Sequence, residues 1–269
     1  MKLGLYLRNM GPQSATDTIV ACARAAEEAG IDDLWVADHI AIPPDDAEGS
    51  GGRYLDPLAT LAFLAGMTGR IALGTGVLVL PYRPPLATAK WIATIQELSA
   101  GRLLLGVGVG WMEAEFRAVG TPHPQRSKIT DHTLAFLHQC FASDEVEANG
   151  QRFLFRPRPA RPPIFIGGAA PHALRRCATY GDGWMPMGVD PAALRPSVDE
   201  LRGQMTKAGK PHPEVVVVTS LALDDGARAS DQIQRFAELG ATRIVHGWRY
   251  PDAFAFARAA HALRRALPG

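Results

Sequence analysis

The sequence predicts a (β/α)8 barrel that occupies residues 1–269 as a single domain. Three observations predict this fold class: apolar strand-like segments alternate with helix-like segments, eight such pairs occur, and no linker or low-complexity segment interrupts them. Apolar strands separated by helices are typical of a parallel sheet covered on its outer face, and eight units in about 250 residues match a closed barrel. An open doubly wound sheet is the alternative, but no Gly-x-Gly-x-x-Gly motif opens the first helix, and eight units overfill that architecture.

The first four strands are aliphatic or β-branched segments bounded by turn-forming residues. They cover residues 2–7, 33–37, 71–80 and 103–109. Thr16 offers an N-cap for the first helix, and Gly30 ends that helix. Residues 42–56 are rich in Pro, Gly and Asp, which predicts a loop. Further helices are expected over residues 58–65, 86–98, 113–118 and 130–141.

A β-hairpin over residues 145–155 is predicted as an insertion after the fourth strand. Asn149-Gly150 lies at its centre between apolar flanks, and this dipeptide is a strong hairpin signal. The alternation of strands and helices then resumes. The remaining strands are expected over residues 164–166, 183–187, 215–223 and 243–246, and the helices over residues 173–180, 191–208, 233–239 and 253–267.

Composition excludes several classes of partner. Lys and Arg number 28 against 27 Asp and Glu, a formal net charge of +1, whereas nucleic acids and anionic membranes select a strong basic excess. No apolar run is long enough to span a membrane, and the N-terminus leads directly into a strand rather than a secretory signal. We therefore expect a cytoplasmic protein. The three cysteines, Cys22, Cys140 and Cys177, lie in helical segments and are expected to be buried apolar side chains.

In a barrel of this type the functional residues lie at the carboxyl ends of the strands. The second strand ends in Asp38-His39. A histidine there can take or give a proton near neutral pH, although a structural hydrogen-bonding role is equally open. The sequence contains no His-x-His pair, so no metal site is expected.

Glycines and tryptophans also gather at the strand ends. Glycine has no Cβ, so a flat or anionic ligand can touch the backbone. Gly167-Gly168 before a helix suits a phosphate group, or it forms only a tight turn, because short glycine motifs are weak evidence. Three tryptophans at these ends are expected either to line a pocket for a planar ring or to fill the rim: Trp111, Trp184 and Trp248.

Several of these segments together resemble the luciferase-like monooxygenase superfamily. The resemblance is carried, in chain order, by Trp35-Val36-Ala37-Asp38-His39, residues 74–78 through Pro84-Pro85, Ala89-Lys90 with Ala93-Thr94, residues 98–102, residues 106–111, residues 163–168 and residues 180–184. It covers about two thirds of the chain. The sequence is most similar to the branch that uses the deazaflavin coenzyme F420, and other relatives use FMN.

The resemblance implies a (β/α)8 barrel that holds a flavin-like ring at its mouth. It places His39, with Asp38, beside the redox face of the ring. It implies a bulge at the third strand, with a non-proline cis peptide behind the ring. The residues that it assigns to the cofactor are Asp38, Thr75, Gly76, Val77, Gly108, Gly110, Trp111, Gly167, Gly168 and Ala169, the last three at the phosphate. Relatives are often dimers, so a homodimer is expected.

Two positions depart from the sugar-phosphate dehydrogenases of this superfamily. Their glutamate after the glycines of the fourth strand assists proton transfer, and Trp111 stands at that position here. Their tryptophan shortly after the Asp-His pair is also missing, since Ile42 and Pro43 lie there. Both changes count against glucose-6-phosphate-type chemistry.

The leading hypothesis is an oxidoreductase that transfers hydride between coenzyme F420 and an unidentified, apolar small molecule. His39 would donate or accept the proton, and the loop at residues 42–56 would act as a lid that excludes water. Three alternatives stay open: an FMN-dependent monooxygenase of the same superfamily, a flavin- or deazaflavin-binding protein without turnover, and a barrel lyase or hydrolase without a redox cofactor.

Overall fold

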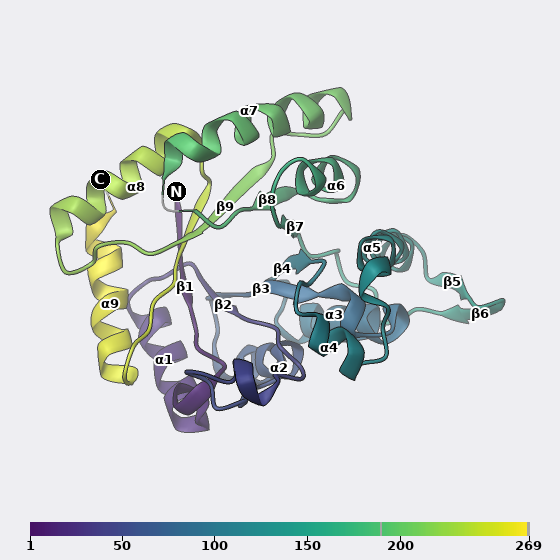
Figure 1. Ribbon diagram of the computed structural model, residues 1–269, viewed down its shortest axis with the longest axis horizontal. Helices are drawn as coiled ribbons and strands as arrows, with labels where there is room; N and C mark the ends of the chain where they lie inside the picture. Colours follow the sequence, from purple (N-terminus) through teal and green to yellow (C-terminus); the bar gives the residue numbers. More distant parts are fainter. Residues whose placement is uncertain (189, 268–269) are drawn as a thin grey trace.

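The computed structural model describes residues 1–188 and 190–267. Within them, eight parallel strands close into a barrel, which confirms the predicted (β/α)8 fold (Figure 1). In order around the barrel the strands are β1 (Lys2–Tyr6), β10 (Arg243–His246), β9 (Glu214–Thr219), β8 (Gly183–Met185), β7 (Ile164–Gly167), β4 (Leu103–Gly108), β3 (Ala72–Val79) and β2 (Asp33–Val36).

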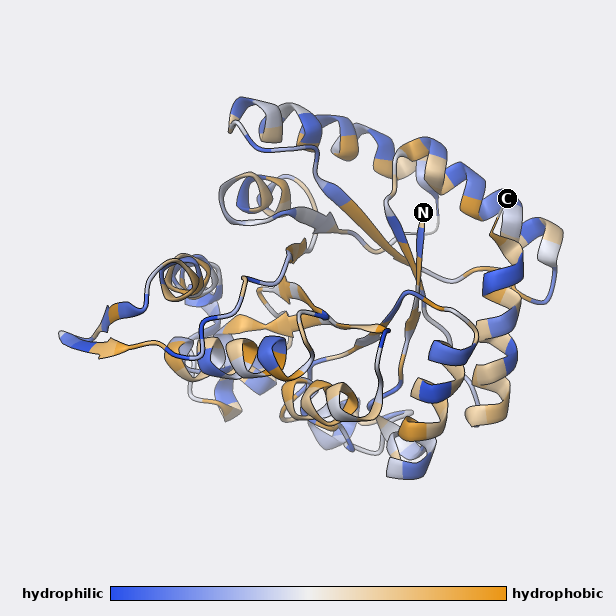
Figure 2. Ribbon diagram, turned by 180° about the vertical axis from the view of Figure 1, so that it is seen from behind, coloured by the Kyte–Doolittle hydropathy of each residue, from blue (hydrophilic) through white to orange (hydrophobic). Residues whose placement is uncertain are grey.

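Helices surround this barrel, and Figure 2 shows hydrophilic and hydrophobic residues alternating along them. In α8 the buried Ala229, Ile233 and Phe236 recur at helical spacing, so one stripe of the helix faces the strands. The helices are α1 (Thr16–Glu28), α2 (Pro57–Met67), α3 (Pro85–Leu98), α4 (Glu113–Ala118), α5 (Arg126–Ala142), α6 (His172–Tyr180), α7 (Pro191–Lys207), α8 (Gly226–Leu239) and α9 (Ala253–Ala266). In the described part of the chain, none of them combines the length and apolar character needed to cross a membrane.

Two hydrophobic layers hold the fold together. The larger layer packs between strands and helices and contains all three cysteines, which are buried and unpaired as expected. The smaller layer fills the barrel interior with the buried side chains of Trp35, Leu104, Phe165, Met185, Val216 and Val245. The interior is therefore a packed core, and any ligand cavity must lie above it at the strand ends.

A charged cluster lies at the opposite end of the barrel, where β2 and β10 begin. Asp33 is fully buried, accepts a hydrogen bond from Trp35 Nε1 and forms an ion pair with Arg243. Burial raises the pKa of Asp33 to about 6, although its contacts with Arg243 and Trp35 act in the other direction. This pair fastens the closing strand β10 to β2 across β1, which lies between them.

The predicted hairpin is confirmed. β5 (Glu145–Ala148) and β6 (Gln151–Leu154) pair antiparallel and project away from the barrel in Figure 1. Asn149 and Gly150 join them with φ of 52° and 75°, the left-handed pair that a two-residue turn of this kind requires. The insertion follows α5, between the fourth and fifth barrel strands.

Some predicted boundaries are wrong for identifiable reasons. Ala15, not Thr16, is the N-cap residue of α1, and no side chain caps that helix. The strand predicted to reach residue 223 ends at Thr219. α8 begins seven residues earlier than predicted, because Asp225 accepts from Arg228 N and starts the helix. Before Ile233, Ala229 is the one buried side chain of this helix, so the apolar pattern there is too sparse to reveal its first turns.

Candidate active site

A cavity of about 430 Å³ opens at the carboxyl ends of the strands, within the size range of small-molecule sites. Most of its surface is apolar or backbone. A neighbouring cavity of about 530 Å³ shares Tyr6, Met187 and Val218 with it. The first cavity is lined by Tyr6, Ala37, Asp38, His39, Gly76, Val77, Val79, Tyr82, Gly108, Val109, Gly110, Trp111, Gly167, Gly168, Met185, Met187 and Val218.

The structure brings nine of the eleven candidate site residues to this cavity; the exceptions are Thr75 and Ala169. Thr75 is buried, and its Oγ1 donates to Gly106 O at 2.7 Å, so its side chain ties β3 to β4. Ala169 is exposed on the turn before α6. Contact of any of these residues with a cofactor stays a prediction.

The third strand has the bulge that the resemblance implied. The pairing of β3 with β4 shifts register between Thr75 and Leu78, and the Gly76–Val77 peptide bond is cis. A Cβ at Gly108 would lie 2.6 Å from Val77 Cγ2, and one at Gly167 would lie 2.7 Å from Val77 Cγ1. These two glycines therefore make room for the Val77 side chain, and the approach of Gly108 to a cofactor stays a prediction.

One of the three strand-end tryptophans lines the cavity. Trp111 lies at its mouth and is 72% exposed. Trp184 is buried beneath the rim, where its Nε1 donates to Gly168 O at 2.8 Å and holds that turn in place. Trp248 stacks between the rings of His246 and Phe256, outside the cavity.

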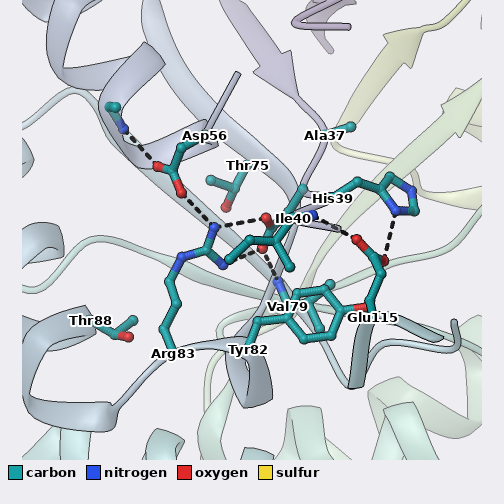
Figure 3. Close-up of polar contacts among 12 residues, drawn as sticks. Ala37, His39, Ile40, Asp56, Thr75, Val79, Tyr82, Arg83, Thr88 and Glu115 are labelled. Atoms are coloured by element: carbon teal, nitrogen blue, oxygen red, sulfur yellow. Dashed lines mark hydrogen bonds and ion pairs between the residues drawn. The ribbon is translucent and has the colours of Figure 1, made fainter. Parts of the chain in front are cut away.

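His39 follows β2 and borders the cavity with its side chain 21% exposed. Its Nδ1 lies 2.9 Å from Glu115 Oε2 (Figure 3). The centroid of its ring lies 4.9 Å from that of Tyr54 and 6.3 Å from that of Trp111. Aromatic side chains therefore limit how the imidazole can turn, while its carboxylate partner lies beneath it.

Glu115 is the residue that the sequence analysis missed. It lies on α4 and is completely buried. Its Oε1 accepts from the backbone N–H groups of Ile40 and Ala41 at 2.6 and 3.0 Å, and its Oε2 also accepts from Tyr82 OH at 2.8 Å. Burial alone would raise the pKa of Glu115, but the hydrogen bonds from His39, Ala41, Ile40 and Tyr82 outweigh it and lower the pKa to about 2.

Asp38 lies beside His39 in sequence, but its carboxylate serves the scaffold. It accepts from Val79 N at 2.8 Å and from both Nη atoms of Arg83, at 2.6 and 2.9 Å. Arg83 also contacts Asp56 at 2.7 Å (Figure 3). Asp38 thus fastens the end of β2 to the end of β3, and its charge is already paired.

Two further titratable groups lie near the barrel mouth. Tyr6 donates its hydroxyl to Gly76 O, and burial raises the pKa of Tyr6 well above its ordinary value. Burial lowers the pKa of His246 to about 4, and its Nδ1 accepts from Leu221 N at 3.0 Å. His246 is therefore neutral and structural. Within residues 1–188 and 190–267, no group of three or more His, Cys, Asp or Glu side chains could hold a metal ion.

The predicted lid residues 42–56 do not line the cavity. The loop is fastened beside it instead: Leu55 N donates to Asn9 O at 2.8 Å, and Asn9 Nδ2 donates to Leu55 O at 2.8 Å. Tyr54 places its ring against His39. A lid function for this loop stays a prediction.

A glycine-rimmed cavity over a packed (β/α)8 barrel defines the class of protein, and comparison with known proteins gives the family. The family model for luciferase-like monooxygenases matches residues 1–266, so the chain belongs to this family. An uncharacterised protein of Mycobacterium tuberculosis is 31% identical over 250 residues, 86% of this chain and 85% of that protein. The F420-dependent hydroxymycolic acid dehydrogenase of the same organism is 32% identical over 187 residues, 66% of this chain and 51% of that enzyme.

Solved structures agree on the fold. Monooxygenase RslO1 from Streptomyces bottropensis superposes with a TM-score of 0.81 at 18% identity, covering 98% of this chain and 97% of that chain. An F420-dependent secondary alcohol dehydrogenase superposes with a TM-score of 0.80 at 17% identity, covering 99% of both chains. These likenesses extend over the whole barrel.

Proposed function

We propose that this protein is an oxidoreductase that transfers hydride between coenzyme F420 and an apolar small molecule. The single observation that carries the proposal is His39, held at the edge of an apolar cavity large enough for a ring system. The relative with 32% identity is an F420-dependent dehydrogenase, which favours F420. An FMN-dependent monooxygenase is the second candidate, favoured by the likeness to a monooxygenase structure.

The residues present fit a planar ring with an anionic tail. The cavity wall at Gly76, Gly108 and Gly167 is backbone and Val77 side chain, a flat apolar surface. In the described part of the chain, Asp38 is the one acidic residue that lines the cavity, and Arg83 neutralises it. No unpaired carboxylate there would repel an anionic ligand.

The chain offers separate places for the ring and for its phosphate. Val77 and Gly76 would lie against the ring, with Met185 at the base of the cavity. Gly167, Gly168 and Ala169 would hold the phosphate, since they precede α6 and helix N-termini favour anions. Trp184 positions this turn through its bond to Gly168 O.

Bound F420 would supply hydride chemistry, and the chain would supply orientation and proton transfer. His39 would take a proton at Nε2 when the substrate is oxidised and return it in the opposite direction. Trp111 and Tyr54 flank the imidazole and would exclude water from this proton.

Titration of the purified protein with F420 and with FMN, followed by visible absorbance, tests the proposal. We expect F420 to bind more tightly. His39→Ala should retain binding but lose turnover, whereas a cofactor carrier would be indifferent to that change. Binding of neither cofactor would refute the proposal and favour the lyase or hydrolase alternative.

We also propose that the chain acts as a homodimer in the cytoplasm on a small-molecule substrate, as its resemblance to dimeric relatives suggests. Sedimentation equilibrium of the purified protein would test the dimer, because a monomer at micromolar concentration contradicts it.

A further inference from the structure

We propose that Glu115 is a positioning residue that fixes the tautomer of His39, so that the cavity selects a substrate bearing a hydroxyl group. The catalytic consequence of this inference rests on the proposed function, whereas the tautomer of His39 does not depend on it. The carboxylate lies out of reach of any ligand, because Glu115 is completely buried and does not line the cavity. It acts through His39.

The hydrogen bonds around Glu115 decide the direction of its contact with His39. Both carboxylate oxygens are occupied, Oε1 by the N–H groups of Ile40 and Ala41 and Oε2 by Tyr82 OH and His39 Nδ1. An ionised carboxylate can only accept hydrogen bonds. Nδ1 of His39 must therefore carry a proton, whether the imidazole is neutral or charged.

The second ring nitrogen is then fixed as well. In neutral His39 with Nδ1 protonated, Nε2 has a lone pair and no proton. The other groups that face the imidazole do not change this assignment. Tyr54 and Trp111 offer their rings, Tyr82 is bound to Glu115, and Asp38 is paired with Arg83.

An acceptor at Nε2 calls for a donor on the substrate, and a hydroxyl group on the carbon to be oxidised supplies one. Its O–H bond breaks, the electron pair stays on oxygen to form the carbonyl, and the proton forms the N–H bond at Nε2. The hydride on the same carbon leaves for the cofactor of the proposed function. The resulting imidazolium is neutralised by Glu115 at 2.9 Å. In reverse, the same imidazolium protonates a carbonyl oxygen.

Glu115→Gln is the decisive variant, because glutamine has the same shape but carries donors. Its amide oxygen can keep the two bonds from Ile40 N and Ala41 N, and its NH2 group then faces His39 Nδ1. That nitrogen must become an acceptor, so the neutral tautomer inverts and Nε2 gains the proton. We expect ¹⁵N NMR of histidine-labelled protein at mildly alkaline pH to show Nδ1–H in the wild type and Nε2–H in the variant. The His39→Ala spectrum assigns the signals.

Glu113→Gln is the matched control. Glu113 lies on the same helix, with its side chain 64% exposed, and forms an ion pair with Arg117 at 3.1 Å. We expect no change in tautomer or rate. With F420 and a panel of apolar secondary alcohols, Glu115→Gln should lower kcat about 100-fold, with KM and cofactor affinity changed less than threefold.

The outcomes separate this inference from the proposed function. Nδ1–H retained in Glu115→Gln, or Nε2–H already present in the wild type, overturns the assignment, and the wild-type spectrum decides this even if the variant does not fold. A rise in KM alone, with kcat unchanged, also overturns it, since that is a structural role. If the tautomer inverts as expected but the wild type binds no F420, the positioning role of Glu115 stands and the proposed function fails.

Discussion

Replacing Glu115 with glutamine should change how the stability of the protein depends on pH. The pKa of Glu115 is lowered from its ordinary value of 4.5 to about 2 in the folded chain. A carboxylate with a lowered pKa stabilises the fold at pH values above its unfolded pKa, and this stabilisation is lost as the pH falls through the folded value. Glutamine resembles the protonated carboxyl group and lacks this contribution at every pH.

The size of the effect follows from the two pKa values. Each pKa unit corresponds to about 1.4 kcal/mol, so the ionised carboxylate contributes about 3 kcal/mol at pH 5 and above. Integration between the two pKa values leaves about 1.4 kcal/mol at pH 3 and under about 0.5 kcal/mol at pH 2. The side chain is completely buried, so solvent does not screen these interactions as it does at the surface.

Urea unfolding of wild type and Glu115→Gln at pH 7, 5 and 3 measures this difference directly. We expect the variant to be less stable by about 3 kcal/mol at pH 7 and 5, with a gap that roughly halves at pH 3. Glu113→Gln, on the exposed side of the same helix, should show no such convergence. A gap that stays constant from pH 7 to pH 3 would refute the argument, because it would assign the loss to packing rather than to an ionised carboxylate.

Three other substitutions test the scaffold of the site. Gly167→Ala should destabilise the fold by about 1–3 kcal/mol, since its Cβ would lie 2.7 Å from Val77 Cγ1; adding Val77→Ala should recover most of the loss in urea unfolding. Arg243→Met should lower the free energy of unfolding by about 3–5 kcal/mol, because it leaves Asp33 buried without its partner. Adding Asp33→Asn should restore much of this stability. Additive losses in the double variant would contradict the pairing. Trp184→Phe should lower the free energy of unfolding by about 1 kcal/mol, because it removes the hydrogen bond to Gly168 O. It should also weaken the binding of FMN or F420 in absorbance titrations. Unchanged affinity would show that this turn holds no phosphate.

Much of the barrel could be predicted because its elements are short and strongly patterned. The continuous apolar runs of the parallel strands and the Asn149-Gly150 turn are local signals. The ends of the helices and strands were harder to predict, because hydrogen bonds set them and the apolar pattern does not reveal those bonds. α8 begins at its Asp225 cap rather than at its first apolar stripe, and α1 begins after an alanine with no side-chain cap.

The predictions for the site divided in the same way, between local signals and contacts over long distances in the sequence. Candidates chosen because barrel chemistry lies at strand ends reached the cavity, among them His39, Gly76 and Trp111. Roles that depend on contacts between distant elements did not follow from the sequence. Gly108 and Gly167 make room for Val77 across two strands, and no spacing rule predicts that packing.

The partner of His39 shows why a missing motif residue is weak evidence for missing chemistry. A glutamate at position 111 would stand at the mouth of the cavity, where Trp111 is 72% exposed. Further along the chain, Glu115 lies on α4, behind His39, and reaches its Nδ1. A carboxylate in that position can orient the imidazole and stabilise its protonated form, yet it adds no charge to the cavity wall. Under the proposed function, the cavity would thereby keep an acid–base group and stay apolar, which is the combination that an uncharged alcohol or ketone requires.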